Sequence, residues 1–253
     1  MEEHCPIVVH RDNEDIVFVR GARDLRRTLL NWRTFSNDAL GMIQIPRQDA
    51  TRDFRQYPIE FDPPEHTAWR ALVEPMFMRP LQPDYIDAVR ALVVSAVEEL
   101  RRDGGGEVVS QFALPLQSRA LTLLLGMPQS EAAIWESWGV HIFGRKGNPD
   151  TARAELLNDY LSQRTDAAPD EYPKSMFAML AHATHEGRSL TRDERLGFAH
   201  LVFAGGRDTL INLIAGIVAH LALHPRDHAR LRDDPSLCVS ATEELVRYMS
   251  PLS

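Results

Sequence analysis

The sequence has 253 residues, of which 44% are hydrophobic and 25% are charged, and its formal net charge is −8. This composition excludes the disordered and fibrous classes, and the acidic balance argues against a nucleic-acid partner, because binding to phosphates needs a positive surface. Cys5 and Cys238 lie far apart and belong to no metal-ligand cluster, which favours a reducing, cytoplasmic compartment.

The first predicted element in chain order is a β-strand at 16–19, followed by a turn at Gly21 and a helix. Residues 36–60 show no periodicity, and we expect this long loop to contribute to a binding site. From residue 62 onward helical spacing dominates, with one more short strand at 107–109. The predicted helices span about 65–78, 82–102, 113–125, 130–143, 150–163, 173–185, 191–223, 225–232 and 236–249. No internal repeat is visible, so the sequence predicts a single, mainly α domain over residues 1–253.

The longest predicted helix, 191–223, contains the unusual segment FAGGRDT. Gly205 and Gly206 each cost on the order of 1 kcal/mol relative to Ala, and a groove that lets something flat or bulky approach closely would offset this. Asp208 and Thr209 would place a carboxylate and a hydroxyl beside that groove. The alternative is a helix crossing at the glycines, with Asp208 paired to Arg207 or solvated. These charged residues also interrupt the apolar run before the roughly 20 residues that a membrane span requires.

A second segment, FDPPEHTAWRALVEPMF, begins at Phe61 and predicts a well-marked helix start. Asp62 is expected to act as the N-cap, with two prolines in the first turn and Glu65 completing a capping box. His66 and Arg70 then project from one face near the helix N-terminus, which suits an anion such as a carboxylate. The alternative is a histidine and an arginine that only face water.

A third segment carries Glu244 and Arg247 three residues apart, so that they can pair on one helix face. Taken alone, this spacing is typical of ordinary helix-surface ion pairs.

In this order the three segments resemble the cytochromes P450, specifically the soluble bacterial kind. FDPPEHTAWR is similar to the family's DPPxHxxxR segment, AGGRDT to its central-helix signature, and EELVR to its ExxR pair. The resemblance implies a mainly α, P450-like fold with a few short β-strands, and haem b as cofactor. It implies haem-propionate contacts for His66 and Arg70, a haem-facing groove at Ala204, Gly205 and Gly206, proton supply by Asp208 and Thr209, and a structural role for Glu244 and Arg247.

The sequence departs from the family pattern in one respect. The haem-iron ligand of the family is a cysteine in a glycine-containing loop well after the ExxR pair, and this sequence stops at Ser253. Cys238 lies before that pair in a helical setting and cannot replace it. We therefore expect no metal ligand in this chain, a thiolate ligand beyond Ser253, and a fold that is incomplete at its C-terminus.

The function that the resemblance implies is that of a haem-thiolate monooxygenase, or of the N-terminal part of one. It would hydroxylate a small apolar substrate with O2, take electrons from a ferredoxin-type donor, and act in the cytoplasm without a nucleic acid or a membrane. The alternative is a truncated, redox-inactive P450-like protein that binds a ligand or partner. A generic all-α regulatory or scaffold protein is a third reading, but it gives no reason for Asp208 and Thr209 after a glycine pair.

Overall fold

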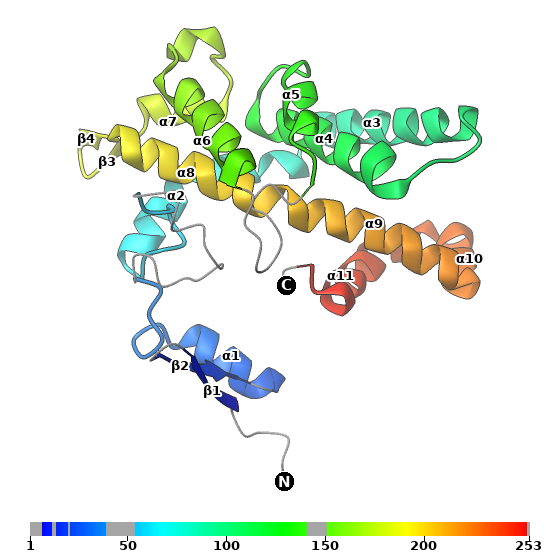
Figure 1. The fold of residues 1–253 in the computed structure, drawn as a ribbon, viewed down its shortest axis with the longest axis horizontal. Helices are drawn as coiled ribbons and strands as arrows, with labels where there is room; N and C mark the ends of the chain where they lie inside the picture. Colours follow the sequence, from blue (N-terminus) through cyan, green and yellow to red (C-terminus); the bar gives the residue numbers. More distant parts are fainter. Residues whose placement is uncertain (1–6, 12–13, 20, 39–53, 141–150, 252–253) are drawn as a thin grey trace.

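The computed structural model describes residues 7–11, 14–19, 21–38, 54–140 and 151–251, and most of these are helical (Figure 1). The α-helices are α1 (Ala22–Leu30), α2 (Glu65–Phe77), α3 (Pro83–Arg102), α4 (Leu114–Leu125), α5 (Glu131–Ser137), α6 (Thr151–Asp166), α7 (Met176–His182), α8 (Arg192–Gly206), α9 (Asp208–Leu223), α10 (Pro225–Asp233) and α11 (Cys238–Met249). Short helical turns are η1 (Arg79–Leu81), η2 (Val109–Ala113), η3 (Pro169–Glu171) and η4 (Pro235–Leu237). The mainly α fold expected from the sequence is confirmed.

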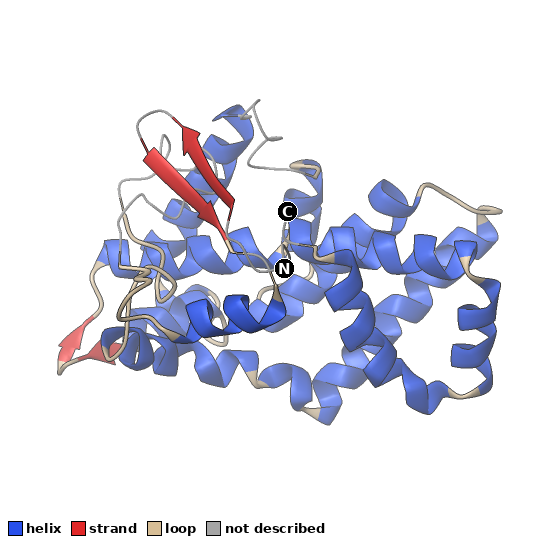
Figure 2. Ribbon diagram, turned by 90° about the horizontal axis from the view of Figure 1, so that it is seen from below, coloured by secondary structure: helices blue, strands red, loops and turns tan. Residues whose placement is uncertain are grey.

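The strands of the described residues form two small antiparallel hairpins (Figure 2). In one hairpin β1 (Ile7–Arg11) pairs with β2 (Glu14–Phe18), and in the other β3 (Thr184–His185) pairs with β4 (Arg188–Ser189). The strand predicted at 16–19 overlaps β2. The strand predicted at 107–109 is wrong, because the Glu107 carboxylate accepts hydrogen bonds from the main-chain N–H groups of Val109 and Ser110 and starts a helical turn there.

The axis of the molecule is the run of α8 and α9, which crosses the whole helical body (Figure 1). The sequence predicts one helix here, but the structure contains a break at Arg207, whose φ of −102° and ψ of −85° are not helical. The prediction of a continuous helix is therefore wrong at one residue. The break falls immediately after the two glycines and immediately before Asp208.

The two halves of this axis differ in how well they are covered. α8 packs against α6 and α7, and residues on all of its sides are buried, including Phe198, His200 and Phe203. Gly197 allows residues 55–57 to cover it closely, since a Cβ there would lie 2.1 Å from the carbonyl oxygen of Arg55. In α9 only Ile211 is buried. The first half is thus a core helix, whereas the second half leaves much of its apolar surface open.

Three further boundaries differ from the sequence predictions. The helix predicted at 173–185 ends at His182, because Glu186 and Gly187 have positive φ values of 50° and 77° and form the turn between β3 and β4. α5 ends at Ser137, and residues 141–143 of the predicted helix lie outside the described residues. The predicted loop 36–60 also lies largely outside them, at 39–53.

By length and composition alone, the stretch Arg192–Leu223 is long and apolar enough to cross a membrane. A single such stretch is weak evidence, because the core helix of a soluble protein passes the same test. Arg207 lies inside this stretch and is buried against the end of α5 rather than exposed on the helix surface.

Candidate functional site

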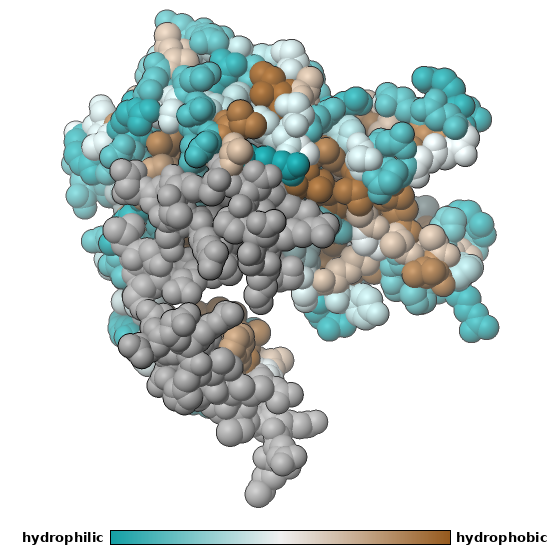
Figure 3. Space-filling model, in the orientation of Figure 1, coloured by the Kyte–Doolittle hydropathy of each residue, from teal (hydrophilic) through white to brown (hydrophobic). Residues whose placement is uncertain are grey.

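A cavity of about 320 Å³ lies beside the helix break. Its walls come from α3, α4, α8 and α9, and almost all of them are apolar. Figure 3 shows hydrophobic side chains gathered along this part of the molecule, over α9. The lining residues are Tyr85, Ala120, Leu121, Leu124, Gly205, Gly206, Thr209, Leu210, Leu213 and Pro251. Three of the residues singled out in the sequence, Gly205, Gly206 and Thr209, therefore share one cavity wall.

The two glycines of this wall have different surroundings. A Cβ on Gly205 would meet no atom within 4 Å, so this residue leaves open space beside the helix. A Cβ on Gly206 would lie 3.5 Å from Cδ1 of Leu121, which is an ordinary contact. The preceding Ala204 is half-buried and is not among the residues that line the cavity. The helix-crossing alternative therefore does not apply at Gly205, where no helix crosses among the described residues.

The polar groups expected beside the groove are present at the break. The Thr209 hydroxyl donates a hydrogen bond of 2.5 Å to the carbonyl oxygen of Gly205, one turn earlier. A hydroxyl that donates its proton still has lone pairs that can accept a hydrogen bond from a water or a ligand. Asp208 is half-buried and interacts electrostatically with Arg207. The turn therefore carries a hydroxyl on the cavity wall next to a carboxylate.

Two polar side chains that the sequence analysis did not assign hold the break in place. Gln117 of α4 is fully buried, and its Nε2 donates a hydrogen bond of 2.9 Å to the carbonyl oxygen of Gly206. Arg207 is only 1% exposed and donates hydrogen bonds to the carbonyl oxygens of Trp135 and Gly139. The signal in the sequence was a polar residue within an apolar helical pattern in both cases. Burial without partners would be too costly for either side chain.

His66 and Arg70 lie on α2, as predicted, but the helix begins differently from the prediction. α2 starts at Glu65 with Pro64 as its N-cap, and no side chain caps it. The Asp62 carboxylate instead accepts hydrogen bonds from Ser36 and from the main-chain N–H of Asn37. These bonds, with the hydrogen bond from Ser36 as the main cause, hold the pKa of Asp62 below its ordinary value. The predicted capping role of Asp62 is therefore wrong.

α2 is connected to the cavity through its buried face. Trp69, Val73 and Met76 belong to the same hydrophobic cluster as Leu121, which lines the cavity. At about 100° per residue, His66 and Arg70 lie within about 60° of Val73, at the edge of that buried face. Arg70 is exposed, and its guanidinium has no hydrogen-bond or ion-pair partner among the residues that the structure describes. The α2 face thus offers a free cation next to the core that supports the cavity wall.

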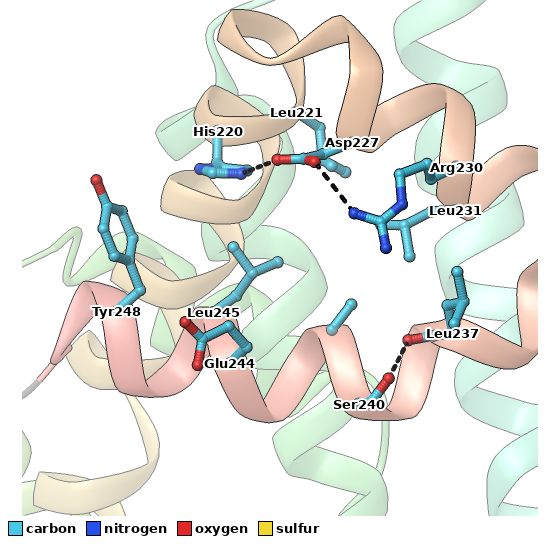
Figure 4. Close-up of a pocket in the computed structure, with 11 residues that line it drawn as sticks. His220, Leu221, Asp227, Arg230, Leu231, Leu237, Ser240, Glu244, Leu245 and Tyr248 are labelled. Carbon is cyan, nitrogen blue, oxygen red and sulfur yellow. Dashed lines mark hydrogen bonds and ion pairs between the residues drawn. The ribbon is translucent and has the colours of Figure 1, made fainter.

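Glu244 and Arg247 form the expected pair on α11, but at the surface. Nε and Nη2 of Arg247 donate to the two carboxylate oxygens of Glu244 at 2.7 and 2.6 Å. The side chain of Arg247 is 70% exposed and that of Glu244 is 61% exposed. The hydrogen bond from Arg247 holds the pKa of Glu244 below its ordinary value. A separate pocket of about 390 Å³ between α9, α10 and α11 includes Glu244 and the ion pair of His220 with Asp227 (Figure 4).

The structure describes one of the two cysteines. Cys238 is an exposed free thiol at the start of α11, and Cys5 lies outside the described residues. Within the described part of the chain, no group of three or more His, Cys, Asp or Glu side chains could hold a metal ion.

Comparisons with known proteins agree with the family resemblance of the sequence. No family model matches the chain. The cytochrome P450 monooxygenase PikC of Streptomyces venezuelae is 30% identical over 249 residues, which cover 94% of this chain and 58% of that protein. The vitamin D(3) 25-hydroxylase of Pseudonocardia autotrophica is 30% identical over 203 residues, which cover 77% of this chain and 49% of that protein.

The fold is also similar to solved structures. A protein described as a carbohydrate active P450 is 41% identical, with a TM-score of 0.89, and the match covers 98% of this chain and 64% of that one. The chain thus spans about half to two thirds of the length of the relatives that it matches.

Proposed function

The chain belongs to the bacterial cytochrome P450 superfamily, and we propose that it supplies the oxygen-activating helix of a haem-dependent monooxygenase. The observation that carries the proposal is the broken turn from Gly205 to Thr209, which opens onto an apolar cavity and presents a hydroxyl there. The proposal concerns the whole protein of which these 253 residues form at least a part.

The described residues fit haem b in two respects. Gly205 leaves open space where a side chain would block a flat macrocycle, and the wall around it is apolar, as a porphyrin face requires. Arg70, with His66 on the same helix face, would hold a propionate, because a cation near a helix N-terminus is well placed for a carboxylate. The cavity extends along α4 and α9 beyond the turn, and we assign only its Gly205 end to the cofactor.

When bound, haem would supply the redox chemistry of O2 activation, with one oxygen atom entering the substrate and the other leaving as water. The chain's own task is to move protons to that site. The Thr209 hydroxyl can pass a proton through a neighbouring water, since it both donates and accepts. The half-buried Asp208 carboxylate can exchange protons with solvent and relay them to Thr209. This placement supports catalytic roles for Asp208 and Thr209.

We propose a small organic substrate that presents an apolar C–H group to the turn. The apolar lining supports an apolar molecule, as the sequence analysis expects. The similarity to a carbohydrate active P450 supports a sugar-derived molecule instead, whose reacting carbon would still be apolar. To distinguish the two substrate classes, representatives of each are titrated into the haem-loaded protein, and binding is measured by the shift of the haem spectrum. A cytoplasmic location and a ferredoxin-type electron donor complete the proposal.

The experiment that tests this function uses the haem-loaded protein and the variant Thr209→Val. The ratio of product formed to reductant consumed should fall at least about tenfold, because proton delivery is lost while reduction continues. Thr242→Val is the matched control. The Thr242 hydroxyl also donates to the carbonyl oxygen four residues earlier, that of Cys238 at 2.8 Å, but it lies at an exposed position of α11. Equal ratios for both variants would contradict the role of Thr209.

The redox-inactive alternative has its own readout. If the purified, reduced protein shows no thiolate-type Soret band with carbon monoxide under any loading condition, the monooxygenase proposal fails and the ligand-binding alternative is favoured.

A further inference from the structure

The side chain of Arg207 extends from the helix break toward the end of α5. Its Nη1 donates to the carbonyl oxygen of Trp135 at 2.9 Å and its Nη2 to that of Gly139 at 2.6 Å. Its Cζ lies 5.4 Å from the centre of the Trp138 ring, within the range of a cation–π contact. One guanidinium therefore contacts two carbonyl oxygens and one ring of the segment 135–139, at the end of α5.

The Trp135 carbonyl is one of the groups that a helix end leaves without a partner, whereas Gly139 lies two residues beyond the end of α5. The last four carbonyl groups of an α-helix have no N–H donor within the helix, and α5 ends at Ser137. A cation there is also favoured by the partial negative charge of the helix end. Arg207 thus caps α5 from a different element, 68 to 72 residues away in the sequence.

Keeping this guanidinium buried is expensive. It is 1% exposed, and its Nε has no hydrogen-bond partner among the described residues. Burial lowers the pKa of Arg207 to about 10, and the carboxylate of Asp208 acts in the opposite direction. A lysine on the surface could cap α5 at a much lower desolvation cost. The arrangement is therefore more than is needed to stabilise a helix end.

We propose that Arg207 is a positioning residue that holds the Gly205–Thr209 turn in its broken geometry and ties Asp208 and Thr209 to the end of α5. The catalytic part of this inference rests on the proposed function, while its structural part does not. The main chain at Arg207 has non-helical angles, and the anchored side chain would keep it in this broken form. Without the anchor, the hydrogen bond of Thr209 to the Gly205 carbonyl and the position of Asp208 would no longer be set by α5.

The test compares Arg207→Met and Arg207→Lys with the matched control Arg195→Met. Arg195 lies on the same helix, α8, and its Nη1 also donates to a main-chain carbonyl, that of Thr165 at 3.3 Å. Amide hydrogen exchange of the purified protein is measured at the end of α5 and in the first turn of α9. Arg207→Met should raise exchange at both places by at least about tenfold, whereas Arg195→Met should leave both unchanged. Arg207→Lys keeps the positive charge but not the two guanidinium donors that reach both carbonyl oxygens, and it should give an intermediate effect.

A second readout uses the haem-loaded protein. Arg207→Met should lower the ratio of product to reductant consumed several-fold, with Arg207→Lys between it and the wild type. An effect on α5 alone, or an unchanged product ratio in a folded variant, would overturn the inference, because Arg207 would then only stabilise α5. If Arg207→Met does not fold, Arg207→Lys decides in the same way. If the wild type itself forms no product while the exchange pattern appears, the proposed function fails and the positioning of the turn stands.

Discussion

The side-chain amide of Gln117 donates a hydrogen bond of 2.9 Å to the main-chain carbonyl oxygen of Gly206, which joins α4 to the last residue of α8. Gln117 is fully buried. The carbonyl lies at the end of a helix that breaks one residue later, where carbonyl groups lack partners within the helix. This hydrogen bond supplies the Gly206 carbonyl with a donor at the point where the helix breaks.

Replacing Gln117 by Leu should therefore destabilise the protein by about 1–3 kcal/mol, because the partly buried Gly206 carbonyl would lose its donor. Urea unfolding measures the change. Gln129→Leu is the control, since the Gln129 amide also donates to a main-chain carbonyl, that of Arg119 at 3.1 Å, and to the Thr122 hydroxyl, but from an exposed position. Its expected effect is below about 0.5 kcal/mol. Equal losses in both variants would contradict the role of Gln117.

Replacing Gly205 by Ala should have opposite effects on stability and on haem binding. The haem-free protein should gain up to about 1 kcal/mol, because Ala favours the helix and its Cβ meets nothing within 4 Å. Haem should dissociate faster, since the methyl group enters the space assigned to the macrocycle. Thermal unfolding and transfer of haem to an acceptor protein measure the two effects.

Gly197→Ala provides the contrast for this experiment. Its Cβ would lie 2.1 Å from the Arg55 carbonyl, so we expect it to destabilise the haem-free protein. Haem retention by Gly205→Ala at the wild-type rate would show that the cofactor does not lie against this residue.

Glu194 should contribute to stability at neutral pH but not in acid. The hydrogen bonds from Arg188, at 2.6 and 2.8 Å, are the main cause that lowers the pKa of Glu194 to about 2. The contribution is present above the ordinary pKa of 4.5 and is lost as the pH falls toward about 2, because only the folded state favours the ionised form. Glu194→Gln should therefore cost about 1–2 kcal/mol at pH 7, since half-exposed Arg188 is partly screened by solvent.

The measurement is the unfolding free energy of wild type and Glu194→Gln from pH 7 to pH 2, where the two curves should meet. Glu98→Gln, in an exposed pair with Arg101, serves as control and should run parallel to the wild type. A constant gap for Glu194→Gln down to pH 2 would mean that its effect is not due to ionisation.

The pair of Glu244 and Arg247 should add little to the stability of this chain. Both side chains are mostly exposed, and such pairs contribute little and weaken with salt. Glu244→Gln should therefore have little effect, whereas Leu245→Ala, which truncates a buried neighbour, should cost about 2–4 kcal/mol. Chemical unfolding at low and high salt compares the two variants. A loss for Glu244→Gln as large as that for Leu245→Ala would show that the pair is packed in solution.

The sequence by itself was enough to predict the helices with strong periodicity and to indicate the family. The helical spacing after residue 62 predicted α2, α3, α4, α10 and α11 closely, since each has an apolar face that repeats at the helical period. The glycine pair followed by Thr209 marked the cavity wall, because glycines are costly inside a helix and a polar side chain stands out in an apolar run.

Only the tertiary structure decided how the helix from 191 to 223 breaks and what holds the break. Arg207 reaches carbonyl groups of Trp135 and Gly139, and Gln117 reaches that of Gly206. Local propensity cannot predict these contacts, because they join segments 68 to 89 residues apart in the sequence. The same reason explains the error at Asp62, whose carboxylate bonds to Ser36 rather than to its own helix. Residue patterns determine which side chains are unusual, but long-range packing determines which partners satisfy them.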